Sequence, residues 1–376
     1  MSSDPKVLVA LIGQTRATEL TFESFRANVL DELGADLALC VASGDGPNPF
    51  HEAAKHVWTF DESGGWARHY DDAADDRGWR TLLEIGPMFM GGIEDKTHPQ
   101  HSSTAISYFY RRLLWRSIQS AGIAGDYDWI VLTRSDFIWP LPHPPVRDLS
   151  DRRVYALDGE QYGGICDRHF VIPRRHFAAV TEGLVAPIFE DPAGLKRRID
   201  QVAAQEGWEH VNIERLFALR LRDQGLWRRV RYLPYVPYTV RAEDGPTTWS
   251  VGVLDTERGY YVKYPTELER SRIAQRFVSD ADSWRRYLSP VRGVRSRWAL
   301  RRAYRRDGLH ERAFPRWGAQ RRAAAGRYGA VRTRTQVLAH ALAVRTGRRL
   351  RTLPLLPTLL DARLRRIRRR AEARAR

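Results

Sequence analysis

The stretch that decides the fold is KVLVALIG at residues 6–13, a short apolar run that ends at a glycine. Such a run predicts a fully buried first strand. An amphipathic helix is expected next, because Thr21 can cap it, apolar residues recur at helical spacing up to Leu33, and Gly34 occupies the stop position. The run DLALCV at residues 36–41 predicts a second buried strand. Strand, helix and strand with short connections form a βαβ unit, so the sequence predicts an α/β fold.

The chain continues to alternate between strands and helices up to about residue 290. Residues 51–98 are rich in Asp, Gly, Trp and His and predict loops and short helices around one strand at 57–60. Strands are predicted at 129–133, 154–157 and 170–172, and helices at 103–121, 174–184 and 210–224. The remaining predictions are an extended segment at 230–240, a hairpin arm at 257–263, and surface helices at 267–277 and 283–288.

Charge is distributed very unevenly along the 376 residues, whose net charge is +16. Residues 284–376 contain 28 Arg, no Lys and four acidic residues, a net charge of +24. Residues 1–283 contain 33 basic and 41 acidic residues, a net charge of −8. We therefore predict a globular domain at 1–283 and a separate Arg-rich helical extension at 284–376.

Several classes of protein are disfavoured by composition. No run of 18 apolar residues occurs, and the first ten residues lack the charged region that precedes a signal-peptide core. Cys40 and Cys166 are too few for a disulfide framework or a cysteine-based zinc site. We expect a cytoplasmic protein in a reducing compartment.

Two predicted strands are followed by polar and charged residues that could bind a ligand. In open α/β sheets, ligands bind outside the carboxyl ends of the strands. The first strand is followed by Gly13, Thr15 and Arg16, a set suited to a phosphate or a nucleobase edge. A single glycine satisfies neither the GxGxxG nor the Walker pattern, which argues against a dinucleotide-binding or P-loop enzyme.

The strand at 129–133 is followed by Arg134, Ser135 and Asp136. A carboxylate in this position can hold Mg²⁺ or Mn²⁺, which prefer oxygen ligands and bridge the diphosphate of a nucleotide. The alternative is a structural ion pair between Arg134 and Asp136 in the turn. The spacing leaves both interpretations open.

Four segments taken in order resemble a known family. They are KVLVALIGQTR at 6–16, YDWIVLTRSDF at 127–137, GGICDRHFVIPRRHF at 163–177, and VNIERLFALRLRDQGLWRRV at 211–230 followed by YTVR. This order is similar to that of GT-A-type glycosyltransferases of bacterial and viral capsule and surface-polysaccharide loci, over roughly residues 5–245. The resemblance implies a GT-A-like, Rossmann-like fold with a mixed, mainly parallel sheet flanked by helices. It also implies sugar transfer from a nucleotide-sugar donor to a glycan or lipid-linked acceptor.

The same resemblance assigns roles to individual residues. Asp136 takes the place of the last carboxylate of a DxD-type element and would be the metal ligand, for Mn²⁺ or Mg²⁺. Arg134 occupies the first position instead of a carboxylate, so a metal-free site in which Arg134 neutralises the diphosphate is the alternative. Gly13, Thr15 and Arg16 would face the nucleotide.

An inverting transfer requires a carboxylate to accept the proton of the acceptor hydroxyl. Asp167 is the first candidate for this catalytic role, and Glu214 is the second. Each also has a structural interpretation, since Asp167 can pair with Arg168 and Glu214 can be a solvated helix residue.

Three explanations remain open for the Arg-rich extension. An anionic membrane surface is favoured, because predicted helices mix Arg with Leu, Ile, Val and Trp. Nucleic acid is favoured by charge alone, and a packed helical appendage that shields an acidic face is the third explanation. The alternatives to a glycosyltransferase are correspondingly a nucleic-acid-binding protein and a nucleotidyltransferase.

Overall fold

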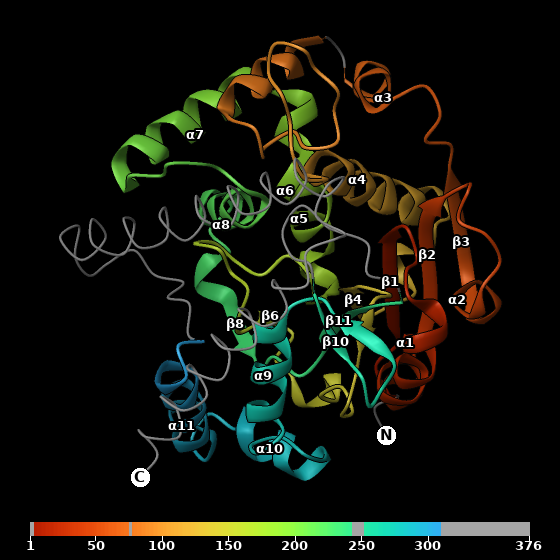
Figure 1. Cartoon of the computed structure of the whole chain (residues 1–376), viewed down its shortest axis with the longest axis vertical. Helices are drawn as coiled ribbons and strands as arrows, with labels where there is room; N and C mark the ends of the chain where they lie inside the picture. The colour runs from red at the N-terminus through yellow and green to blue at the C-terminus, as the bar shows by residue number, and fades with distance from the viewer. Residues whose placement is uncertain (1–3, 75–76, 243–251, 310–376) are drawn as a thin grey trace, which may run out of the picture. The chain divides into compact units, whose positions relative to one another are not determined.

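A seven-stranded sheet forms the centre of the protein in the computed structural model, which describes residues 4–74, 77–242 and 252–309 (Figure 1). The strand order is β3-β2-β1-β4-β7-β6-β8. The bounds are β1 Val7–Gly13, β2 Asp36–Ala42, β3 Ala54–Phe60, β4 Trp129–Thr133, β6 Val154–Leu157, β7 Phe170–Pro173 and β8 Val230–Leu233. All neighbouring strands are parallel except β7, which is antiparallel to β4 and β6. The predicted α/β fold with a mixed, mainly parallel sheet flanked by helices is confirmed.

Both faces of the central strands are buried, which explains why β1, β2 and β4 are almost uninterrupted apolar runs, whereas the edge strand β3 alternates between half-buried and exposed positions. In β1, Leu8 and Ala10 face one hydrophobic cluster, whereas Val7, Val9 and Leu11 face a second cluster on the other side. This alternation is the period of two expected of a strand.

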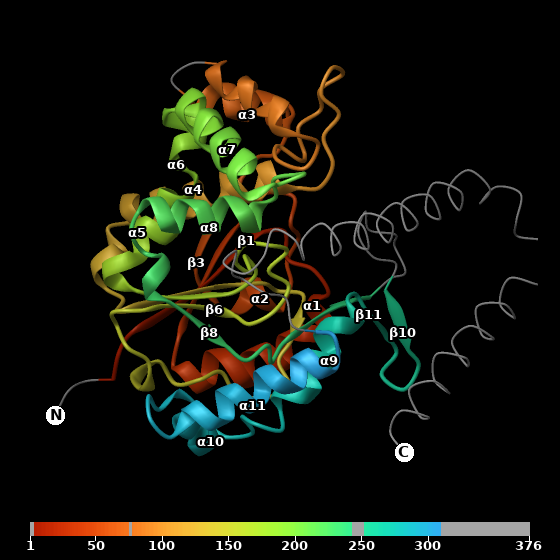
Figure 2. The same cartoon turned by 90° about the vertical axis from the view of Figure 1, so that its left-hand side faces the viewer.

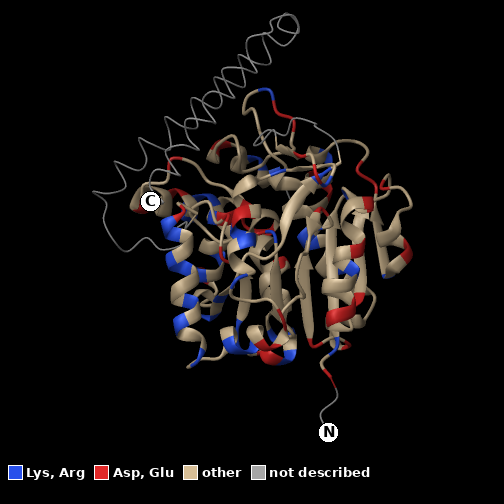
Figure 3. Ribbon diagram, turned by 60° about the horizontal axis from the view of Figure 1, so that its bottom comes forward, with Lys and Arg blue, Asp and Glu red and all other residues tan. Residues whose placement is uncertain are grey.

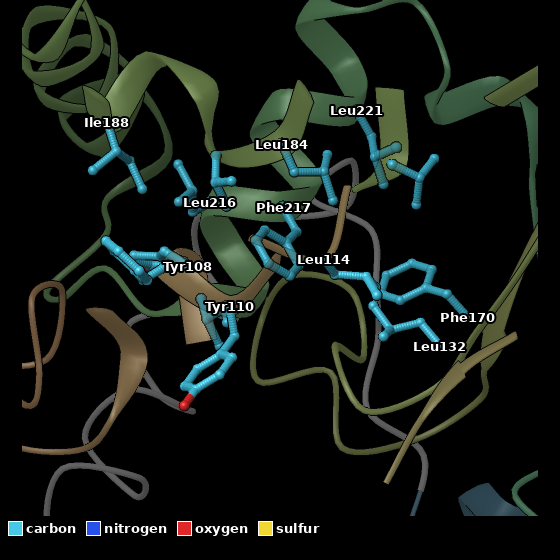
Figure 4. Close-up of a cluster of buried hydrophobic side chains, with 14 of the residues drawn as sticks. Tyr108, Tyr110, Leu114, Leu132, Phe170, Leu184, Ile188, Leu216, Phe217 and Leu221 are labelled. Carbon is cyan, nitrogen blue, oxygen red and sulfur yellow. The ribbon is translucent and has the colours of Figure 1, made fainter. Parts of the chain in front are cut away.

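Helices cover the two faces of the sheet in two layers (Figure 2). One layer contains α4 Thr104–Ser120, α5 Phe177–Val180, α6 Glu182–Glu190, α7 Pro192–Glu206 and α8 Ile213–Asp223. Figure 4 shows the core on this side, where Tyr108 and Leu114 of α4 lie near Phe217 of α8. The other layer contains α1 Thr18–Phe25, which continues as a π-helical turn over Arg26–Asp31, with α9 Pro265–Ala274, α10 Ala281–Leu288 and α11 Gly293–Arg306.

The region predicted as loops and short helices has that character. It contains α2 Pro49–Ala53, α3 Trp66–Ala73 and a 3₁₀ segment at Arg77–Ile85. The single helix predicted at 174–184 is instead a 3₁₀ turn at Arg174–His176 followed by α5 and the start of α6. The backbone of Thr181 departs from helical geometry at φ −94° and ψ −93°, and this break separates α5 from α6.

A small second sheet lies beside the first and has the order β10-β11-β9-β5. Its strands are β5 Phe137–Ile138, β9 Tyr238–Arg241, β10 Val253–Asp255 and β11 Tyr260–Val262. The extended segment predicted at 230–240 is therefore two strands in two sheets, β8 and β9. Pro234 and Pro237 lie between them, where a proline removes a backbone donor and ends ladder pairing.

The helices predicted to lie on the surface are partly buried. Glu267 and Ile273 of α9 have no exposed surface, and Trp284 of α10 is 1% exposed. The Trp284 indole also donates a hydrogen bond to the Pro142 carbonyl at 3.1 Å. Each of these helices has an exposed side and turns an apolar face to the second cluster, as expected of an amphipathic surface helix.

The domain division predicted after residue 283 stays a prediction, although within the described residues α11 packs against the second cluster. The helices predicted at 319–345 and 358–374 lie outside the described residues. Within residues 4–74, 77–242 and 252–309, no helix is both long and apolar enough to cross a bilayer.

Candidate functional site

The exits of β1 and β4 lie next to each other. The two strands are parallel neighbours in which Leu11 pairs with Thr133. Gly13 ends β1 with φ +87°, a left-handed conformation that glycine adopts without strain. Beyond this turn, the backbone N–H of Arg16 donates to the hydroxyl of Ser135 at 2.9 Å. The two loops with binding chemistry therefore meet at one edge of the sheet.

A cavity of about 200 Å³ opens at this edge. It is bordered by five of the seven residues singled out from the sequence: Gly13, Arg16, Arg134, Asp136 and Asp167. One wall is the N-terminal half of α4, which contributes Ser103, Ile106, Ser107, Tyr110 and Arg111. The position agrees with the rule that ligands bind beyond the carboxyl ends of parallel strands.

Thr15 and Glu214 are not among the residues that border this cavity. The Thr15 hydroxyl donates to the Asp45 carboxylate at 2.6 Å and accepts from the Asn48 amide at 2.8 Å, so it anchors the loop that follows β2. Glu214 lies in the first turn of α8 and is 7% exposed. Its carbonyl oxygen accepts from Ile165, and any side chain on Gly164 would collide with it.

Arg134 and Asp136 form a two-fold hydrogen-bonded ion pair. The guanidinium Nε lies 2.7 Å from Asp136 Oδ1, and Nη2 lies 2.6 Å from Oδ2. Burial alone would raise the pKa of the Asp136 carboxyl. The charge and hydrogen bonds of Arg134, with the charges of Lys263 and Arg16, outweigh burial and hold that pKa at about 2. Asp136 is therefore ionised and fully engaged at neutral pH.

These residues do not fit a divalent cation. A metal at Asp136 would have to replace Arg134 at both carboxylate oxygens and withstand the charges of Arg16 and Lys263. Within the described part of the chain, no cluster of three or more His, Cys, Asp or Glu side chains could hold a metal ion. The structural ion pair considered from the sequence is thus present, and the site is organised around cations.

Lys263 is a charged neighbour of the site that sequence analysis missed, although it is not among the residues that border the cavity. It follows β11 in the small sheet, and its backbone N–H donates to the Thr239 carbonyl at 2.9 Å. Burial, and then repulsion by Arg134, lower the pKa of Lys263 to about 8, although Asp136 acts in the opposite direction. Cations that repel one another in this way are stabilised by an anion placed between them.

Arg168 was also missed, as was its partner on a distant helix. Arg168 borders the cavity and forms a buried ion pair with Glu267 of α9. The second Glu267 oxygen accepts the backbone N–H of Thr239 at 2.7 Å. The Arg168 guanidinium also lies 4.7 Å from the centre of the Tyr264 ring. Glu267 thus fixes the position of Arg168 at the cavity.

A hydrogen bond from Arg111 holds the backbone of Asp167 in place. Arg111, which is 1% exposed, donates from Nη2 to the Asp167 carbonyl at 2.8 Å and lies against the faces of Phe170 and Phe217. Asp167 itself is only partly buried. A carboxylate on a fixed backbone at the edge of a polar cavity can accept a proton from a bound hydroxyl. Glu62, which accepts from the Tyr110 hydroxyl at 2.7 Å, is the other carboxylate exposed to the cavity besides the paired Asp136.

No protein-family model and no curated protein matches this chain. Among solved structures, mouse xyloside xylosyltransferase 1 in its apo form has 9% sequence identity to it and a TM-score of 0.34. The alignment covers 61% of this chain and 86% of the mouse protein. A score this low carries no weight for function, which rests instead on the residues of the cavity.

Proposed function

We propose that this chain is a GT-A-type glycosyltransferase that moves a sugar from a nucleoside diphosphate donor to a hydroxyl group of an acceptor. The observation that carries the proposal is the group of cations at the exits of β1 and β4. Arg16, Arg134 and Arg168 border one cavity, and Lys263 is coupled to all three. These four cations outnumber the two carboxylates that pair with them, Asp136 and Glu267, and a diphosphate would balance the excess positive charge.

The same cations account for the chemistry of the departing group. Bond cleavage between the sugar C1 and the diphosphate oxygen leaves an electron pair and extra negative charge on that oxygen. Fixed cations near the diphosphate stabilise this charge more in the transition state than in the ground state, which lowers the barrier. We assign this role to Arg16 and Arg134, which border the cavity, with the charge of Lys263 in support, and no metal ion is needed for it.

We assign the proton transfer to Asp167. In an inverting displacement, the acceptor hydroxyl gives its proton to the Asp167 carboxylate while its oxygen forms the new bond to C1. Asp167 borders the cavity and its backbone is fixed by Arg111. Asp136 is unsuited to this task because both of its oxygens accept from Arg134.

The resemblance of the four sequence segments to enzymes of capsule and surface-polysaccharide synthesis favours a glycan or lipid-linked acceptor. A small cavity that is open on one side is compatible with an acceptor whose reactive hydroxyl enters while the remainder stays outside.

Calorimetric titration with UDP, GDP and CDP, with and without Mn²⁺, tests the donor assignment. We expect at least one of them to bind without metal, and Arg16→Met to weaken binding about tenfold while leaving the fold intact, since Arg16 is exposed. Arg174→Met is the matched control, because Arg174 pairs with Asp128 at 2.6 Å near the opposite end of β4. Absence of nucleotide binding, together with salt-sensitive DNA binding, would reject the proposal in favour of a nucleic-acid-binding protein.

A further inference from the structure

Helix α11 has two apolar faces, and only one of them is buried by the protein. Leu300 and Tyr304 have no exposed surface and belong to the second hydrophobic cluster. Trp298 is 61% exposed. Since a helix turns by roughly 100° per residue, Trp298 and Leu300 point in nearly opposite directions. The buried face anchors α11, and the opposite face is directed away from the core.

The exposed face carries a continuous apolar stripe. Val294 is 55% exposed, and Val291, in the turn just before the helix, is 83% exposed. Val294 and Trp298 have the i, i+4 spacing that places residues on one side of a helix, and Val291 precedes the helix. In the described part of the chain, the other exposed large hydrophobic residues are Val57, Tyr162, Val253 and Leu254, with exposed fractions of 40–56%. Concentration of three such side chains within eight residues marks an interaction surface.

Cations surround this stripe. The α11 sequence GVRSRWALRRAYRR contains six Arg and no acidic residue, and in Figure 3 its basic positions form a blue column at the left of the ribbon. Arg295 and Arg302 are exposed on the same side as the stripe. The Arg302 guanidinium lies 5.4 Å from the centre of the Trp298 ring. Apolar side chains, a tryptophan and flanking arginines are therefore combined on one solvent-facing side.

We propose that this surface, formed by Val291, Val294 and Trp298 with Arg295 and Arg302, docks on an anionic membrane. At a bilayer surface the apolar side chains enter the headgroup region, while the arginines meet lipid phosphates, so both features contribute. A nucleic acid would engage the arginines but leave the two valines in water. The helix lies parallel to the membrane and does not cross it. This inference is independent of the sugar-transfer proposal, because no cavity residue takes part in it.

Flotation of the full chain with vesicles tests the docking. We expect it to bind mixed phosphatidylcholine–phosphatidylglycerol vesicles and to bind phosphatidylcholine vesicles at least about tenfold more weakly. The double variant V294S/W298S should lose about tenfold in partitioning, whereas V253S/L254S, which alters the exposed apolar pair of β10, should match wild type. The charge variant R295E/R302E should lose more than K96E/R197E, which makes the same change in net charge at two exposed sites elsewhere.

The sequence beyond Leu309 contains a further 19 Arg, which could attract the chain to anionic vesicles by charge alone. The depth that a label on α11 reaches in the bilayer distinguishes docking by α11 from this attraction. Cys40 and Cys166 are buried, so W298C can be labelled selectively with an environment-sensitive dye. We expect a blue shift and quenching by spin-labelled lipid at position 298, and neither in the control variant L254C. Failure to bind vesicles, binding with a solvated label at position 298, or retention of full binding by V294S/W298S would each overturn the proposal.

Discussion

The ion pair of Asp136 makes a quantitative prediction about stability. Its carboxyl pKa is 3.8 in an ordinary environment and about 2 in the folded protein. At about 1.4 kcal/mol per pKa unit, the ionised form contributes about 2 kcal/mol to the free energy of unfolding. Asp136 is 3% exposed, so solvent screening reduces this value little. We therefore expect Asp136→Asn to lower the free energy of unfolding by about 2 kcal/mol at pH 7.

The pH dependence fixes the sign of this effect. A carboxyl whose pKa is lowered by folding stabilises the protein above its unfolded pKa of 3.8, and that contribution disappears as the pH falls towards 2. Urea unfolding of wild type and Asp136→Asn should therefore differ by a constant amount from pH 7 to about pH 5 and converge below it. Asp151→Asn is the control, because Asp151 pairs with Arg175 at an exposed site, and it should unfold like wild type.

One outcome would refute the assignment of Asp136 to the ion pair. If Asp136→Asn is as stable as wild type at pH 7, but turnover is lost and returns with high Mn²⁺, then Asp136 is a metal ligand. Equal stability without any metal effect would show that Arg134 is held by other groups. Only a pH-dependent loss of stability agrees with the geometry seen here.

Three further predictions concern the site and the C-terminal helices. Nucleoside diphosphate affinity should fall as the pH rises through about 8, where Lys263 loses its charge. This fall in affinity should be absent in Lys263→Met and should move to higher pH in Lys263→Arg. Turnover should survive exhaustive chelation, measured as nucleoside diphosphate release, because the Arg134–Asp136 pair leaves no carboxylate oxygen for a metal; its loss and restoration by Mn²⁺ would contradict this. Trp284→Ala should cost about 3–5 kcal/mol in urea unfolding, whereas Trp298→Ala should change stability by less than about 0.5 kcal/mol; equal effects would contradict the burial of α10.

The sheet was predictable wherever strands are buried on both faces. KVLVALI and WIVLT contain no polar residue except their ends, and each became a central parallel strand. The antiparallel direction of β7 was not predictable, because FVIP has the same apolar pattern in either direction. The buried side of α9 was not predictable, for a different reason. Its buried positions include Glu267 and Arg270, which read as solvated until their partners Arg168 and Glu160 are known.

The sequence predicted only the part of the candidate site that comes from the loops after β1 and β4. Residues 13–16 and 134–136 follow adjacent parallel strands, and this topology brings them together. Thr15 has a hydroxyl that could bind a ligand, but in the structure it donates its hydrogen bond to Asp45, which the sequence did not indicate. Lys263 and Glu267 come from a hairpin and a helix more than 90 residues beyond Asp167, and no motif connects these segments. Pairings over such separations are encoded in the tertiary fold and leave no local pattern.

The buried pair of Arg168 and Glu267 has a consequence for how the protein is made. Arg168 leaves the ribosome 99 residues before its counter-ion. Until α9 has emerged, burying Arg168 in the cavity wall would leave its charge without a partner, which costs about 3–5 kcal/mol. The β1–β4 half of the site can form early in synthesis, yet a nascent chain cannot hold the finished arrangement until α9 has emerged. If the cavity binds a nucleotide-sugar donor as proposed, its competence to do so would be acquired late in synthesis.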